Sequence, residues 1–132
     1  MEIVALVVGA TGIAGRGASQ ELVNFGAHVH GLSRHREGVV SGVEHVAADL
    51  LDPSSVGKAV SRLKPTHVYL TAWSRRPTEE ANIKVNAGIV RTVLDALAPA
   101  RSVKHVALVT GLKHYLGPFE RSEERRVGKE CA

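Results

Sequence analysis

The chain has 132 residues, of which 44% are hydrophobic and 23% are charged, and its formal net charge is +4 at pH 7. This length accommodates one compact domain with a hydrophobic core. The basic residues are dispersed between apolar segments, which argues against nucleic-acid binding. No segment approaches the roughly 20 apolar residues of a membrane span. The one cysteine, Cys131, excludes an intrachain disulfide and a thiolate metal cluster, so we expect a reduced, cytoplasmic protein.

The first part of the chain alternates apolar runs with a helical pattern. Residues 3–8 form a continuous apolar run rich in β-branched residues, which is typical of a strand covered on both faces. After the glycines that follow it, apolar residues recur at helical spacing as far as Phe25, and Gly26 supplies a stop. Two further strands are expected, over residues 28–33 and over residues 43–47.

The second part continues the alternation. Asp52 can cap a helix over residues 53–63. A strand is expected over residues 67–72, a long helix over residues 78–99 and a fifth strand over residues 103–109. This order predicts an α/β fold with a doubly wound parallel sheet, the Rossmann type, of strand order 3-2-1-4-5.

Three glycines lie between the first strand and the first helix. Gly9 permits a tight turn, Gly12 lets the backbone approach a pyrophosphate, and Gly15 lets the helix pack close to the sheet. The amides and the dipole at that helix N-terminus then attract phosphates. The alternative is a structural glycine turn without a ligand, but the strand and helix on either side favour nucleotide binding.

The end of the second strand indicates which nucleotide binds. An NAD site usually carries Asp or Glu there, whereas this chain has Ser33, Arg34 and Arg36, with no carboxylate before Glu37. A guanidinium suits the 2′-phosphate of NADP(H), which we therefore predict as the cofactor. The alternative is that both arginines are solvated loop charges. Asp49, after the third strand, either accepts from the adenine amino group or caps its own loop.

Histidines near the starts of strands are the candidates for metal binding. His28 and His30 alternate on one strand face, but no third ligand converges on them from sequence, so no metal site is expected. His67 and His105 are interpreted as polar residues at strand entries. Asn86 shares a helix face with Asn82, and either hydrogen-bonds near the site or satisfies a buried backbone group.

Several segments together resemble the progesterone 5β-reductase/iridoid synthase-like group of atypical short-chain dehydrogenases/reductases. The widely shared part of the likeness is the glycine loop. The most specific part is Thr110-Gly111-x-Lys113-His114-Tyr115-x-Gly117-Pro118-Phe119-Glu120. The matching segments cover residues 9–15, 31–34, 49–50, 66–73, 80–86 and 110–120.

The resemblance implies an NADPH-dependent oxidoreductase that reduces the C=C bond of an enone. Lys113 stands at the position of the family's catalytic lysine, and would bind the nicotinamide ribose and support a tyrosine. We do not assign that tyrosine to Tyr115, because the family's tyrosine lies farther along the chain. Trp73 lines the cofactor or substrate cleft, or is a packing aromatic. The cofactor-binding residues expected from these segments are Gly9, Thr11, Gly12, Ile13, Gly15, Ser33, Arg34, Asp49, Leu50, Thr71 and Trp73.

The likeness stops after Glu120. We therefore expect residues 1–120 to be a partial, C-terminally truncated NAD(P)-binding Rossmann domain, and residues 121–132 to be a non-native or disordered tail. Such a fragment would bind the cofactor at most, and a homodimer is compatible with the full-length protein. Two alternatives stay open for the function. One is an NAD-dependent epimerase or dehydratase, and the other is a non-catalytic NAD(P)-binding regulator.

Overall fold

A five-stranded parallel sheet of order β3-β2-β1-β4-β5 organises the chain, as the sequence predicts. The computed structural model describes residues 2–109. The elements are β1 (Val4–Val8), α1 (Ile13–Phe25), β2 (His28–Ser33), β3 (Glu44–Ala47), α2 (Pro53–Val60), β4 (His67–Leu70), α3 (Glu79–Leu97), the 3-10 helix η1 (Ala98–Ala100) and β5 (His105–Leu108).

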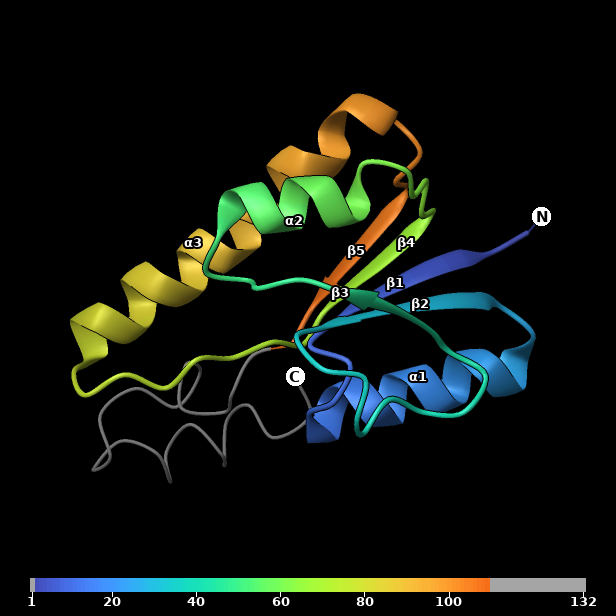
Figure 1. The fold of residues 1–132 in the computed structure, drawn as a ribbon, viewed down its shortest axis with the longest axis horizontal. Helices are drawn as coiled ribbons and strands as arrows, with labels where there is room; N and C mark the ends of the chain where they lie inside the picture. Colours follow the sequence, from blue (N-terminus) through green and yellow to red (C-terminus); the bar gives the residue numbers. More distant parts are fainter. Residues whose placement is uncertain (1, 110–132) are drawn as a thin grey trace, which may run out of the picture.

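The helices cover both faces of the sheet, with α1 on one side and α2 and α3 on the other (Figure 1). The larger core lies under α2 and α3, where Leu6, Leu32, Val68 and Val93 are buried. The smaller core lies under α1 and is built around Val7, with Ala10 and Val29. Alternate residues of β1 thus point into different cores, which explains why its sequence is apolar throughout.

The helix ends follow local chemistry. Asp52 caps α2 by accepting a hydrogen bond from the amide of Ser54, and Thr78 caps α3 by accepting one from the amide of Ala81. Gly26 ends α1 in the left-handed region, with φ of 95°. Among the described residues, none of these helices is both long enough and apolar enough to cross a membrane.

The exposure of two apolar side chains and the ends of some elements do not follow from the sequence pattern. Phe25, which ends the helical apolar pattern of the first helix, is 74% exposed, and Ile83 of α3 is 63% exposed. The buried side of α1 is set by Gly15 and Ser19, and Phe25 lies on another side of the helix. Strand β4 ends at Leu70, earlier than expected, because the chain there leaves the sheet to form the rim of a cavity.

The glycine loop is the tightest junction in the fold. A Cβ added at Gly15 would lie 2.0 Å from the carbonyl oxygen of Gly9 and 2.9 Å from Oγ1 of Thr71. That hydroxyl in turn lies 2.7 Å from the carbonyl oxygen of Val8, to which it donates. Gly9 itself has φ of 88°, which favours glycine. The start of α1, the end of β1 and the end of β4 therefore meet at van der Waals distance.

Replacing Gly15 by alanine should lower the free energy of unfolding by about 1–3 kcal/mol, because the new methyl group overlaps the Gly9 carbonyl. Gly17, in the same helix, has no atom within 4 Å of an added Cβ. Gly17→Ala should instead raise the free energy of unfolding by about 0.5–1 kcal/mol. Denaturant unfolding of both variants measures the difference, and an equal effect at the two positions would contradict this packing.

Candidate functional site

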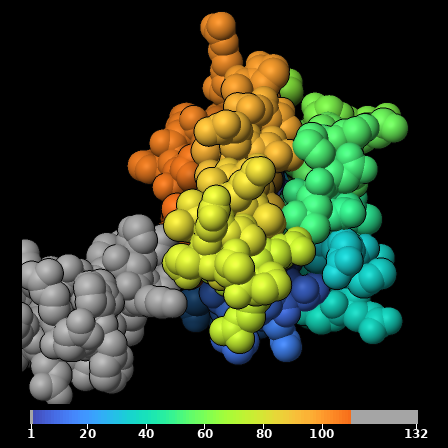
Figure 2. All heavy atoms as spheres, turned by 90° about the vertical axis from the view of Figure 1, so that its left-hand side faces the viewer, coloured from blue at the N-terminus to red at the C-terminus, as the bar shows by residue number. Residues whose placement is uncertain are grey.

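A cavity of about 490 Å³ opens at the carboxyl ends of the strands. It is bounded by the loops that follow β1, β2, β3 and β4, and by Ile89 of α3. These segments gather on the face of the molecule shown in Figure 2, with the start of α3 in yellow, the approach to α2 in green and the glycine loop in blue. In an open α/β sheet, the carboxyl ends of the strands form the usual ligand-binding rim.

Most of the residues expected to bind a cofactor line this cavity, although they come from four separate loops. Those are Gly9, Thr11, Gly12, Ser33, Arg34, Asp49, Leu50 and Trp73. The other three lie beside it. Ile13 begins α1 and is 96% exposed, while Gly15 and Thr71 form the junction between α1 and the sheet.

The N-terminus of α1 lies at the cavity, where Gly12 forms part of the lining. Gly12 is the N-cap residue and supplies no side chain to the first turn, which also contains no acidic residue. An added Cβ at Gly12 would meet nothing nearer than the Gly9 carbonyl oxygen, at 3.7 Å. The protein's own packing therefore does not require glycine here. The bare backbone instead leaves room for a ligand to approach the positive end of the helix dipole.

Ser33 shapes the turn that carries Arg34. Its hydroxyl donates to the carbonyl oxygen of His35 (2.8 Å) and lies 3.0 Å from Nε2 of His45. Ser33 is 7% exposed, whereas Arg34 is exposed at the cavity rim. The serine hydroxyl is thus engaged within the turn, and the guanidinium is the group that reaches the rim. Arg36 does not line the cavity.

Asp49 makes the local hydrogen bond that its loop-capping interpretation predicted. One carboxylate oxygen, Oδ1, accepts from the amide of Leu51 (3.0 Å), and the Asp49 amide donates to the hydroxyl of Ser55 (3.0 Å). These contacts fix the loop between β3 and α2. Asp49 nevertheless lines the cavity, so capping the loop does not remove it from the site.

The loop after β4 is held by two asparagines of α3. The side chain of Asn86 accepts from the amide of Ser74 (2.8 Å) and donates to its carbonyl oxygen (2.9 Å). Asn82 accepts from the amide of Arg76. Asn86 thus satisfies a part-buried backbone group and, at the same time, positions the site. Trp73 on this loop is 66% exposed in the described part of the chain and lines the cavity.

Sequence reasoning missed Arg76, a second guanidinium in the cavity wall. Its Nε is buried and has no hydrogen-bond partner among residues 2–109. A basic residue just beyond the carboxyl end of a strand is the signal that would have found it. The remaining lining residues that were not predicted are Ala48, Leu51, Ala72, Ser74 and Ile89. Lys113, Tyr115 and the expected tail at 121–132 lie outside the described residues.

Parallel strands in the order 3-2-1-4-5, with a glycine loop opening onto the carboxyl rim, define a Rossmann-type α/β protein. The sequence matches the NAD dependent epimerase/dehydratase family over residues 5–128, and the chain belongs to that family.

Curated relatives narrow the likeness to the group that the sequence suggested. The chain is 35% identical over 127 residues to an (S)-8-oxocitronellyl enol synthase of Camptotheca acuminata, covering 89% of this chain and 33% of that protein. It is 34% identical over 128 residues to a 3-oxo-Delta(4,5)-steroid 5-beta-reductase of Arabidopsis thaliana, with the same coverage of each. The resemblance to this group is thus confirmed, and the chain spans about one third of the length of these relatives.

Solved structures agree on the fold. The UDP-glucose 4-epimerase of Thermus thermophilus, in complex with NAD, superposes with a TM-score of 0.68 at 27% identity, over 78% of this chain and 36% of that one. The Bordetella bronchiseptica enzyme WbmH, in complex with NAD+, gives a TM-score of 0.70 at 20% identity, over 90% of this chain and 42% of that one. The second likeness concerns the fold alone.

Removing the Asn86 side chain should leave the amide and the carbonyl oxygen of Ser74 without their partners. Asn86→Ala should therefore lower the free energy of unfolding by about 1–3 kcal/mol, and should speed amide exchange at Ser74. Asn24, which accepts from Gln20 on the exposed side of α1, is the control. Asn24→Ala should change stability by less than about 0.5 kcal/mol. Similar losses of stability in both variants would contradict a specific role of Asn86 in holding the backbone of Ser74.

Proposed function

We propose that this chain is the NADP(H)-binding part of a reductase that acts on the C=C bond of an enone. The observation that carries the proposal is the pairing of an uncapped helix N-terminus with an exposed arginine across one cavity. The first suits a diphosphate and the second suits an additional phosphate. When bound, the cofactor supplies a hydride.

The glycine loop would hold the diphosphate. The N-terminus of α1 lies at the cavity, and the absence of a Cβ at Gly12 would allow phosphate oxygens to approach the amides of the first turn. The first turn contains no carboxylate that would repel an anion. Thr11 lines the same wall and offers a hydroxyl.

The adenosine end would lie over β2 and β3. Arg34 would recognise the 2′-phosphate through its fork of N–H donors, and no acidic residue occupies its position at the rim. Oδ1 of Asp49 is engaged with Leu51, which leaves the second carboxylate oxygen to accept from the adenine amino group. Leu50 supplies apolar contact to the base.

The catalytic part of the proposal rests on the resemblance and the named relatives. Trp73 and Arg76, whose Nε has no hydrogen-bond partner among residues 2–109, line the cavity after β4. Lys113 follows β5 in the sequence and would bind the nicotinamide ribose. Negative charge would develop on the carbonyl oxygen of the enone when a hydride is added to its β-carbon. Lys113 would support a tyrosine that stabilises this charge and that lies farther along the complete protein than the segments matched here.

A second candidate is an NAD-dependent epimerase or dehydratase acting on a sugar nucleotide. The structural likeness to a UDP-glucose 4-epimerase favours it. The two candidates differ in the expected cofactor, because the epimerase structure contains NAD and therefore no 2′-phosphate.

NADPH should bind this chain about ten- to a hundredfold more tightly than NADH, since a charged hydrogen bond contributes about 1.5–3 kcal/mol. Arg34→Asp should abolish that preference, mainly by weakening NADPH. Fluorescence titration of the reduced nucleotides measures both affinities.

Two variants serve as controls for that preference. Arg36→Asp makes the same charge change outside the cavity lining and should preserve most of the preference. Gly12→Ala should weaken both nucleotides alike, because its methyl group faces the shared diphosphate. If Arg34→Asp still binds NADPH more tightly than NADH to the same extent, the assignment of NADP(H) is wrong.

The product of the complete gene should oxidise NADPH when an enone is added, and the saturated ketone should accumulate in equal amount. Lys113→Ala should lower kcat by about 100-fold, the usual loss when a group that stabilises an oxyanion is removed. Lys104→Ala replaces an exposed lysine just before β5 and is the matched control. Turnover of a UDP-sugar with NAD, and none of the enone, would favour the second candidate.

A further inference from the structure

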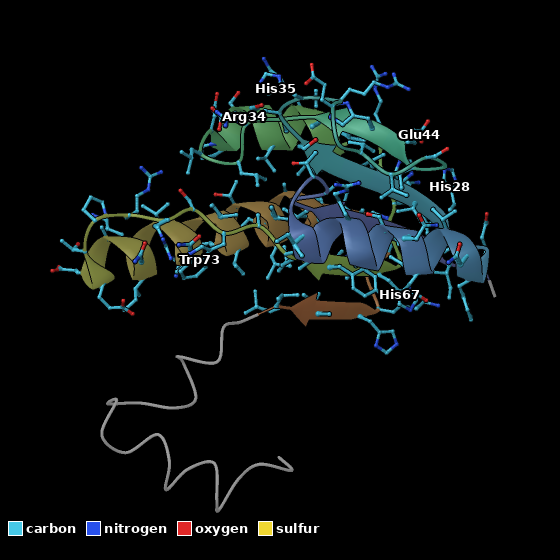
Figure 3. All side chains as sticks on the ribbon, turned by 90° about the horizontal axis from the view of Figure 1, so that it is seen from below. His28, Arg34, His35, Glu44, His67 and Trp73 are labelled. Carbon is cyan, nitrogen blue, oxygen red and sulfur yellow. The ribbon has the colours of Figure 1, made fainter. Side chains whose placement is uncertain are left out.

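Three metal-ligating side chains meet at the end of the sheet opposite the cavity. His28 and His30 come from β2, and the strand register places Glu44 of β3 beside His30. One nitrogen of each histidine and one carboxylate oxygen of Glu44 all lie within 4.8 Å of one another. Figure 3 shows His28 and Glu44 together at this end, far from Arg34 and Trp73. The sequence revealed the two histidines but not the third donor.

The separations are close to those that one small ion needs, and the exposed side chains of His28 and Glu44 would shift to close the set. Oε2 of Glu44 lies 2.9 Å from Nδ1 of His30 and 3.5 Å from Nε2 of His28. Donors at about 2.0–2.2 Å from a tetrahedral zinc ion are separated by roughly 3.3–3.5 Å. The two imidazole rings stack with centroids 4.6 Å apart, so their nitrogens are presented side by side.

His30 supplies a buried donor atom that faces Glu44. Its Nδ1 makes no hydrogen bond within the described residues and lies 2.9 Å from Oε2 of Glu44. Burial lowers the pKa of His30, and His28 adds to this effect against the opposing influence of Glu44.

We propose that His28, His30 and Glu44 bind a divalent transition-metal ion, of which Zn²⁺ is the probe of choice. Two imidazole nitrogens and one carboxylate oxygen are ligands that zinc accepts, and nickel and copper share the preference for imidazole. The side chains of His28 and Glu44 are 54% and 63% exposed, so an ion can enter from solvent and the carboxylate can adjust. Three protein ligands leave a coordination position for water.

The ion pair of Glu44 with the histidines is a weak alternative explanation for the cluster. An exposed ion pair such as that of His28 and Glu44 contributes about 0–1 kcal/mol. A bound cation would instead use all three donors at once. The site lies at the amino ends of β2 and β3, so metal binding should leave nucleotide affinity unchanged.

Calorimetric titration of the 132-residue chain with ZnCl₂ tests the proposal. The chain carries Cys131→Ser, because a free thiol also binds zinc. We expect one equivalent of Zn²⁺ to bind. His28→Gln and Glu44→Gln, both at exposed side chains, should each weaken binding by about tenfold or more. Glu44→Asp keeps the carboxylate and should weaken binding less than Glu44→Gln does.

The matched control is the other stacked histidine pair, formed by His67 and His105 on β4 and β5. Their ring centroids are 4.9 Å apart and their planes are inclined by 28°, the same inclination as in the first pair. No such third donor accompanies them among the described residues. His105→Gln should therefore leave zinc affinity unchanged. Absence of stoichiometric binding, equal binding by all variants, or an equal loss in His105→Gln would each overturn the proposal. Circular dichroism of every variant confirms that the fold is retained.

Discussion

The absence of a side chain at Gly15 is the constraint on which the geometry of the site depends. It lets the first turn of α1 rest against the carbonyl oxygen of Gly9, while the hydroxyl of Thr71 ties the end of β4 to the end of β1. A helix held this close has its N-terminus at the rim where the parallel strands end, beside the cavity. A residue with a Cβ at this position would push α1 away from Gly9 and would move that N-terminus.

Much of the fold was predictable because its determinants are local. The apolar run of β1, the Asp52 and Thr78 caps and the left-handed Gly26 each act within a few residues, and their alternation limits the topology to a doubly wound sheet. What local patterns could not fix was the side of each helix that meets the sheet. Phe25 and Ile83 carry apolar side chains on sides that the described part of the chain leaves exposed.

The candidate site likewise contains residues that the sequence could predict and residues that only the structure brings together. The glycine loop and Arg34 follow directly from their positions after strands, so sequence could propose them. Ile89 reaches the cavity from the middle of α3, and only the packing of that helix against the sheet brings it there. Asn86 could be recognised as polar on an apolar face, but its partner, the backbone of Ser74, depends on the path of a loop. Arg76 became evident because its buried Nε lacks a hydrogen-bond partner in the described part of the chain.

The two ends of the sheet present opposite chemistry, and the parallel topology is the reason. Each strand-helix-strand unit places the N-terminus of its helix at the carboxyl ends of the strands and the C-terminus of that helix at their amino ends. The carboxyl rim therefore carries helix amides and a guanidinium, which attract anions. The amino end carries helix carbonyl groups: α1 ends at Phe25, directly before the strand that begins with His28. The proposed metal site at this end would instead offer lone pairs of imidazole and carboxylate to a cation, so the two ends of the sheet present ligand groups of opposite kind.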